Sequence, residues 1–187
     1  MLKIALIVVA ILVAGVLVFA ATRPNTFRVQ RSARITAPPE KIFALINDFH
    51  SWGLWSPWEK IDPALKRTFT GEPSGKGAMY AWEGNSKVGS GSMEITESAP
   101  SSRILIKLDF IKPFEGHNVT DFTLVPDGDT TEVTWLMHGP VPYVGKIMHM
   151  FINMDKMVGG QFETGLANLK AAAEQGTPAQ LSPEAKA

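Results

Sequence analysis

The sequence predicts an α+β domain that follows a single apolar segment, and three observations support this prediction. Residues 4–21 are all apolar or Gly. Several stretches between residues 27 and 139 alternate apolar and polar side chains, and this period of two is typical of half-buried strands. Residues 154–174 repeat apolar side chains at spacings of three and four, which is typical of an amphipathic helix. The chain after the apolar segment has a normal size for one domain.

The apolar segment is long enough to cross a bilayer. At a rise of 1.5 Å per residue, a helix over residues 4–21 reaches ~27 Å, close to the thickness of the hydrocarbon core. We therefore expect residues 1–21 to form a single-pass transmembrane anchor or an uncleaved signal. Val18 and Ala20 also provide the small-residue pattern of a signal cleavage site, so a cleaved signal peptide is the alternative.

The charges that flank the apolar segment leave open on which side of the membrane the domain lies. Arg residues follow the segment at positions 23, 28, 31 and 34, whereas Lys3 alone precedes it, and the positive-inside rule then favours a cytoplasmic domain. A signal anchor or a cleaved signal would place the domain on the opposite side. Residues 22–26 form a tether that extends at most ~20 Å, so an anchored domain would lie close to the bilayer.

The composition excludes several classes of function. The chain has no cysteine, which removes disulfides, thiolate nucleophiles and cysteine metal sites. Its 18 basic residues balance its 18 acidic residues, so the chain has no bulk field that would attract nucleic acid. We expect no nucleic-acid partner.

The first part of the domain predicts one strand and two short helices. Residues 27–36 carry apolar side chains at alternate positions, and Arg31 alone breaks this apolar face. Residues 37–48 predict a helix that begins at a pair of prolines and has its apolar residues on one side. The aromatic-rich residues 48–58 predict a second short helix followed by a loop.

The middle of the chain predicts about six further strands. Clusters of turn-forming residues divide residues 65–139 into short segments. The alternation of apolar and polar side chains is clearest in residues 102–110 and 131–137. It implies an antiparallel sheet with one covered face.

The helix predicted over residues 154–174 provides the cover, because its apolar stripe needs a partner. Gly159 and Gly160 lie inside this helix, each about 1 kcal/mol less favourable than Ala, so we expect a kink or a frayed first turn. Residues 176–187 contain two prolines and few apolar residues, and we expect them to be disordered.

Several short motifs accompany this order of elements. They are Ala-Pro-Pro-Glu-Lys-Ile-Phe at 37–43, Trp-Ser-Pro-Trp at 55–58, Gly-Asn-Ser-Lys-Val-Gly-Ser-Gly at 84–91, Thr-Glu-Val-Thr-Trp at 131–135 and Gly-Leu-Ala-Asn-Leu-Lys at 165–170. With this order, the chain resembles the START-like, or SRPBCC, superfamily, and specifically its polyketide cyclase/dehydrase and lipid transport branch.

The resemblance implies a START-like domain over residues 27–175 with the helix-grip fold. In that fold a curved antiparallel sheet of about seven strands wraps a long C-terminal helix and leaves an apolar cavity between them. Members of the superfamily include lipid carriers, quinone-binding proteins, hormone receptors and cyclases, so the resemblance does not identify one substrate.

The sequence offers little for catalysis or metal binding. His50, His117, His138 and His149 fall in different predicted elements, and none has a Ser or Asp at a spacing typical of nucleophilic catalysis. No His-x-x-x-His pair exists, so we expect no metal site, and nothing implies a cofactor. Asp121 and His138 are the candidates for a cyclase-type acid or base, because the alternation around them leaves their direction open.

Many methionine and aromatic side chains could line the cavity that the resemblance implies. Methionine adapts to varied ligands and aromatic rings bury large flat areas, although the same residues also build ordinary cores. The candidate ligand-binding residues are Trp55, Trp58, Met79, Trp82, Met93, Phe110, Phe122, Trp135, Met137, Met154, Met157 and Phe162.

Trp52, Trp55 and Trp58 lie in the loop that, in the resembled fold, is near the cavity mouth. If the three tryptophans have a functional role, they form a lid over the cavity, or an interfacial belt that rests on lipid headgroups. If their role is structural, they fill the open end of the sheet.

The leading prediction for the function is a membrane-tethered binding protein for an apolar or amphipathic small molecule, such as a lipid, an isoprenoid quinone or a polyketide-like compound. The first alternative is a cyclase or hydrolase that acts on such a ligand through Asp121 or His138. The second is a protein-interaction module whose groove binds a protein segment.

Overall fold

The computed structural model describes residues 2–150 and 153–175, so the disorder predicted for residues 176–187 falls outside the described part. The strands are β1 (Thr26–Ile35), β2 (Lys66–Gly71), β3 (Ala78–Glu83), β4 (Ser90–Ala99), β5 (Arg103–Lys112), β6 (Gly116–Asp127) and β7 (Thr130–Pro140). The helices are α1 (Leu2–Ala21), α2 (Pro39–Asn47), α3 (Tyr143–His149) and α4 (Met154–Glu174), with the short 3-10 helices η1 (Phe49–Leu54) and η2 (Pro57–Lys60).

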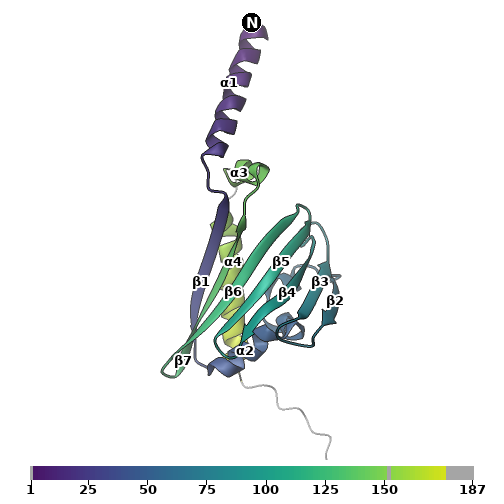
Figure 1. Ribbon diagram of the computed structural model, residues 1–187, viewed down its shortest axis with the longest axis vertical. Coiled ribbons are helices and arrows are strands. Elements are labelled where there is room, and N and C mark those ends of the chain that lie inside the picture. Colours follow the sequence, from purple (N-terminus) through teal and green to yellow (C-terminus); the bar gives the residue numbers. More distant parts are fainter. Residues whose placement is uncertain (1, 151–152, 176–187) are drawn as a thin grey trace, which may run out of the picture.

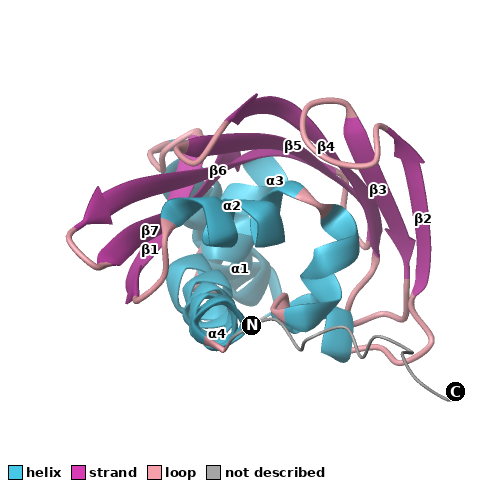
Figure 2. Cartoon of the chain, turned by 90° about the horizontal axis from the view of Figure 1, so that it is seen from below, coloured by secondary structure: helices cyan, strands magenta, loops and turns pink. Residues whose placement is uncertain are grey.

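The strands form one antiparallel sheet in the order β1-β7-β6-β5-β4-β3-β2. From β2 to β7 each strand pairs with the next along the chain, and β1 completes the sheet by pairing with β7. The sheet bends into an arc with α2 and α4 inside it (Figure 2). This is the helix-grip fold, and the predicted α+β class is confirmed.

Arg31, the residue that breaks the apolar face of the first strand, has a structural role. It lies on the inner face of β1, where Nη1 donates to Asp155 Oδ1 at 2.9 Å and Nε donates to Glu163 Oε1 at 2.6 Å. A Cβ on Gly159 would overlap the Arg31 guanidinium, so the glycine permits this approach. The predicted frayed first turn is wrong, because α4 is helical without a break from Met154 and the Asn153 side chain caps its first turn by accepting from Lys156 N at 2.9 Å; the kink stays a prediction.

The core between sheet and helices is rich in aromatic rings. Trp55 and Phe122 are fully buried, and their ring centroids lie 6.0 Å apart. The Nε1 atoms of Trp52 and Trp55 donate to the carbonyl oxygens of Ile46 and Leu45 at 2.9 and 3.0 Å, which ties η1 to the end of α2. Because Trp52 and Trp55 are core residues, this pair cannot form an interfacial belt.

Helix α1 projects from the end of the domain where α3 lies (Figure 1). It has a mean hydropathy of 3.2 and is exposed along most of its length, so it is long and apolar enough to cross a membrane, as a signal sequence also would be. Two hydrogen bonds join this end of the chain to the domain, from Tyr143 Oη to the Leu17 carbonyl at 2.5 Å and from Val141 N to the Asn25 carbonyl at 2.7 Å. The sequence did not predict α3.

Candidate functional site

A cavity of about 700 Å³ lies between the concave face of the sheet and α4. Strands β3 to β7 provide one wall, and the N-terminal half of α4 provides the opposite wall. Residues of η1, η2 and α3 complete the lining.

Most of the predicted ligand-binding residues line this cavity. They come from η2, from the inward face of the sheet and from α4, and they are Trp58, Trp82, Met93, Phe110, Trp135, Met137, Met154, Met157 and Phe162. The rings of Trp135 and Phe162 stack with centroids 4.1 Å apart and planes inclined by 9°, which joins the β7 wall to the α4 wall. The cavity is therefore bordered mainly by large apolar side chains.

Three predicted residues do not line the cavity. Trp55 and Phe122 are fully buried and pack into the core behind the wall. Met79 lies on the outer face of β3 and is 40% exposed. It could not share a face with Trp82, because the two residues are separated by an odd number of positions in one strand.

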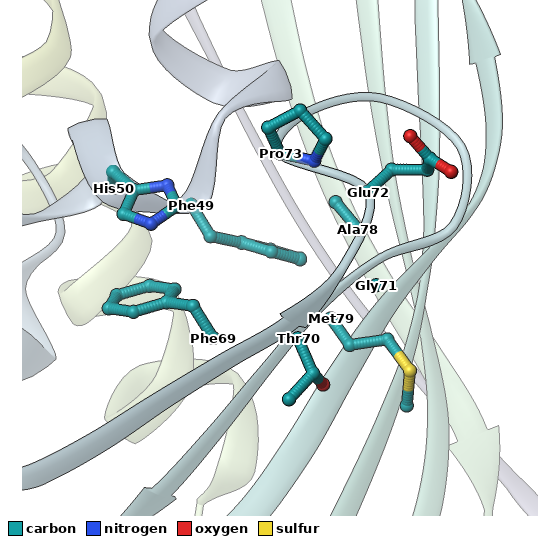
Figure 3. Close-up of a pocket in the computed structure, with 9 residues that line it drawn as sticks. All are labelled: Phe49, His50, Phe69, Thr70, Gly71, Glu72, Pro73, Ala78 and Met79. Atoms are coloured by element: carbon teal, nitrogen blue, oxygen red, sulfur yellow. The ribbon is translucent and has the colours of Figure 1, made fainter.

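Met79 instead borders a smaller pocket of about 150 Å³ at the edge of the sheet, between η1 and the hairpin that joins β2 to β3 (Figure 3). The His50 ring stacks on Phe69 there with a centroid separation of 4.2 Å, and the hairpin around Pro73 forms the rim. His50 Nδ1 lies 2.9 Å from Asp48 Oδ1, a contact that holds the imidazole beside its own helix. This pocket is too small for the ligands that the large cavity would admit.

Some cavity residues were missed by the sequence analysis. Tyr80 lies two positions from Trp82, and Leu108 lies two positions from Phe110. Each pair therefore shares one face of its strand, so the alternation could have identified Tyr80 and Leu108. The residues of α3 and the segment before it had no such signal. The missed apolar residues include Phe27, Trp52, Tyr80, Leu108, Val141, Val144 and Met148.

A few polar side chains interrupt the apolar lining. Asn118 and Thr120 lie on the inward face of β6 and are buried, and neither side chain makes a hydrogen bond within residues 2–150 and 153–175. These two side chains are therefore available to a ligand that carries hydrogen-bonding groups.

A cluster of polar side chains borders the cavity on the side of β2 and β3. Tyr80 Oη donates to Glu59 Oε1 at 2.6 Å, and Arg67 Nε donates to Glu59 Oε2 at 2.5 Å. Burial, and then the bond to Glu59, raise the pKa of Tyr80 well above its usual value, so the phenol stays neutral. The bond to Glu59 likewise raises the pKa of Arg67. Because both Glu59 oxygens accept these bonds, the carboxylate acts as a structural ion-pair partner.

The two candidates for an acid or base lie outside the cavity, which corrects the sequence analysis. Thr120 and Phe122 point inward, so Asp121 between them points to the outer face, where Oδ2 accepts from Arg103 Nη2 at 2.7 Å. Met137 points inward, so His138 is exposed on the outer face of β7. Neither side chain borders the cavity.

Comparison with known proteins agrees with the geometry. The family model for polyketide cyclase/dehydrase and lipid transport matches residues 26–174. A search among curated proteins found no significant match.

Solved structures share the fold at low sequence identity. Protein CV1439 from Chromobacterium violaceum is 18% identical with a TM-score of 0.56, over 82% of this chain and 100% of that one. The Aha1 dimer from Colwellia psychrerythraea is 18% identical with a TM-score of 0.56, over 81% and 98% of the two chains. The di-domain ARO/CYC BexL from the BE-7585A biosynthetic pathway is 14% identical with a TM-score of 0.59, over 86% of this chain and 54% of that one. The chain belongs to the polyketide cyclase/dehydrase and lipid transport family of the START-like superfamily.

Proposed function

We propose that this protein binds an apolar or amphipathic small molecule in the cavity between its sheet and α4, and that α1 holds it at a membrane. The observation that carries the proposal is the size and lining of the cavity. Its volume of about 700 Å³ falls within the range of about 300–1,000 Å³ that is usual for small-molecule sites. The lining is mainly aromatic rings, methionines and aliphatic side chains.

Apolar burial would supply most of the affinity. A ligand that buries about 300 Å² of apolar surface gains about 7 kcal/mol before the cost of immobilising it. Asn118 and Thr120 would orient the ligand, because their unpartnered groups can form hydrogen bonds that water no longer provides. A chain-like molecule with one polar group, such as a lipid, an isoprenoid quinone or a polyketide-like compound, fits this arrangement.

The membrane part of the proposal rests on α1. An 18-residue stretch of α1 has a mean hydropathy of 3.2, and α1 joins the domain within a few residues. The bond between Val141 N and the Asn25 carbonyl also holds the connecting segment against the domain. An anchored domain would therefore stay within reach of molecules that dissolve in the lipid phase.

Native mass spectrometry of the full chain, extracted in a mild detergent with a panel of lipids and quinones, tests the proposal. Val158 lies on α4 in the cavity wall, so V158W should fill the space and lose the ligand. V125W is the matched control, because Val125 is 55% exposed and does not border the cavity. Thermal unfolding of both variants shows whether each is folded.

The outcomes separate the alternatives. A folded wild-type chain that remains empty through the whole panel contradicts the proposal. Stoichiometric capture of a protein segment in the cavity would replace it with an interaction module. Chemical conversion of the bound molecule would replace it with a cyclase or hydrolase, which would then need a group other than the outward-facing Asp121 and His138.

A further inference from the structure

Two exposed apolar segments flank the cavity mouth. The end of β5 presents Ile111, the turn that follows it presents Phe114, and α3 presents Tyr143 and Val144. Phe114 and Val144 are 64% and 66% exposed, yet both also border the cavity. We call these four residues the lip. Water-exposed side chains of this size at the entrance of an apolar cavity indicate a surface that is covered in use.

The lip lies at the end of the domain from which α1 projects. Tyr143 Oη donates to the carbonyl of Leu17 at 2.5 Å, so α3 lies against the last turn of α1. The turn between β5 and β6 lies at the same end of the sheet (Figure 1). Leu17 precedes the last residue of α1 by four positions, which is about 6 Å of helix.

This position fixes the depth of the lip relative to the helix. If α1 crosses a bilayer up to Ala21, the Tyr143 hydroxyl lies about 6 Å inside the level of Ala21, next to the boundary between hydrocarbon and headgroups. Tyrosine is enriched at that boundary because its ring is apolar and its hydroxyl is polar. A bilayer that holds α1 therefore meets α3 as well.

The charges around the mouth suit a headgroup layer. Lys87 and Lys112 border the mouth, and Arg23 follows α1 with its guanidinium 4.5 Å from the centre of the Phe19 ring. Basic side chains near a membrane are attracted to anionic lipids. Glu115 is the acidic residue on the turn, and it lies 3.4 Å from His117 Nε2.

We propose that the lip inserts into the interfacial layer of the bilayer that α1 crosses, so that the cavity opens onto lipid instead of water. The partner of this surface is the lipid bilayer itself. The inference rests on the anchoring role proposed for α1 and holds whichever ligand the cavity takes. It gives an apolar molecule a route between bilayer and cavity that does not pass through bulk water.

Depth-dependent fluorescence quenching tests the proposal. The full chain has no cysteine, so F114C and V144C each provide one labelling site for an environment-sensitive fluorophore. Each labelled variant is reconstituted into vesicles of phosphatidylcholine with some phosphatidylglycerol, containing lipids spin-labelled near the headgroup or near the bilayer centre. V13C in α1 reports the anchor, and V125C at the far end of β6 is the matched exposed control.

The expected result is a blue-shifted emission at F114C and V144C that shallow spin labels quench more than deep ones. V13C should be quenched by deep labels, and V125C should be quenched by neither. If V13C is quenched while the two lip positions behave like V125C, the lip proposal is wrong and the anchor stands. If V13C is not quenched either, both the anchor and the lip proposal are wrong.

Discussion

The guanidinium of Arg31 and the carboxylate of Asp155 join the first strand of the domain to the first turn of its last helix, with Nη1 and Oδ1 2.9 Å apart. Arg31 also donates to Glu163, two turns further along α4. The bond to Asp155 is the main reason that the pKa of Arg31 is raised, and the bond to Arg31 lowers the pKa of Asp155. These contacts set the position of the helix that forms one wall of the cavity.

Substitution of Gly159 should disturb this junction, and Gly160 provides the matched control. In G159A the new Cβ would overlap the Arg31 guanidinium and force it to shift, so weaker bonds to Asp155 and Glu163 should offset the gain from helix propensity and G159A should be less stable than G160A. In G160A the new Cβ meets open space, so we expect a gain of about 1 kcal/mol from helix propensity. Thermal and urea unfolding of the two variants measure both effects. Equal stabilisation by the two substitutions would show that Arg31 does not lie against Gly159.

Substitution of Thr120 should separate polar from apolar contributions to ligand binding. T120V removes the unpartnered hydroxyl from the cavity wall at nearly constant volume, so a ligand that uses this hydroxyl should bind about fivefold more weakly, the equivalent of a hydrogen bond of about 1 kcal/mol. A purely apolar probe should bind at least as tightly as before. Titration calorimetry with both kinds of ligand measures the difference.

T123V is the control for that experiment, because Thr123 lies on the outer face of the same strand. It should leave both affinities unchanged. If T123V weakens the polar ligand as much as T120V does, the effect does not arise in the cavity.

The pair formed by His117 and Asp109 predicts a pH dependence on the outer face of the sheet. The bond to Asp109 is the main cause that raises the pKa of His117, and Glu115 adds to it. A raised pKa in the folded state means that the contribution to stability is complete below about pH 6.5 and is lost as the pH rises through the folded value.

In D109N the His117 pKa should therefore fall. The free energy of unfolding should then change less with pH above about pH 6.5 than it does in the wild type. Titration of the His117 ring protons by NMR and urea unfolding across the same pH range measure the two effects. E115Q should lower the His117 pKa by less, because Glu115 is the smaller cause. If E115Q lowers the His117 pKa more than D109N does, then Glu115 and not Asp109 is the main cause of the raised pKa.

Removal of the two outward-facing candidates should leave ligand occupancy unchanged. D121N weakens the ion pair with Arg103, and H138Q changes an exposed side chain, so neither alters the cavity wall. Native mass spectrometry should find the same bound ligand in both variants as in the wild type, whereas V158W should be empty. Loss of ligand in folded D121N or H138Q would mean that one of these groups reaches the ligand.

The sequence by itself determined the fold class, the strands and the long helices, and the face on which the residues of the clearly alternating strands lie. Alternation with a period of two depends only on backbone geometry, so it is enough to assign Trp135 and Met137 to one face of their strand. The same rule excludes Met79 once Trp82 is assigned to the cavity. The apolar run that forms α1 was equally clear, because its composition depends on no tertiary partner.

Only the tertiary structure decided which buried residues form a cavity wall and which fill the core. Phe122 and Trp135 share the inward face, yet Trp135 borders the cavity and Phe122 packs behind it. That difference depends on the curvature of the sheet and on where Arg31 holds α4, and these arise from contacts between residues far apart in the sequence. The position of α3 beside α1 was also decided only by the tertiary structure, because no repeating pattern in the sequence predicts the bond from Tyr143 to Leu17.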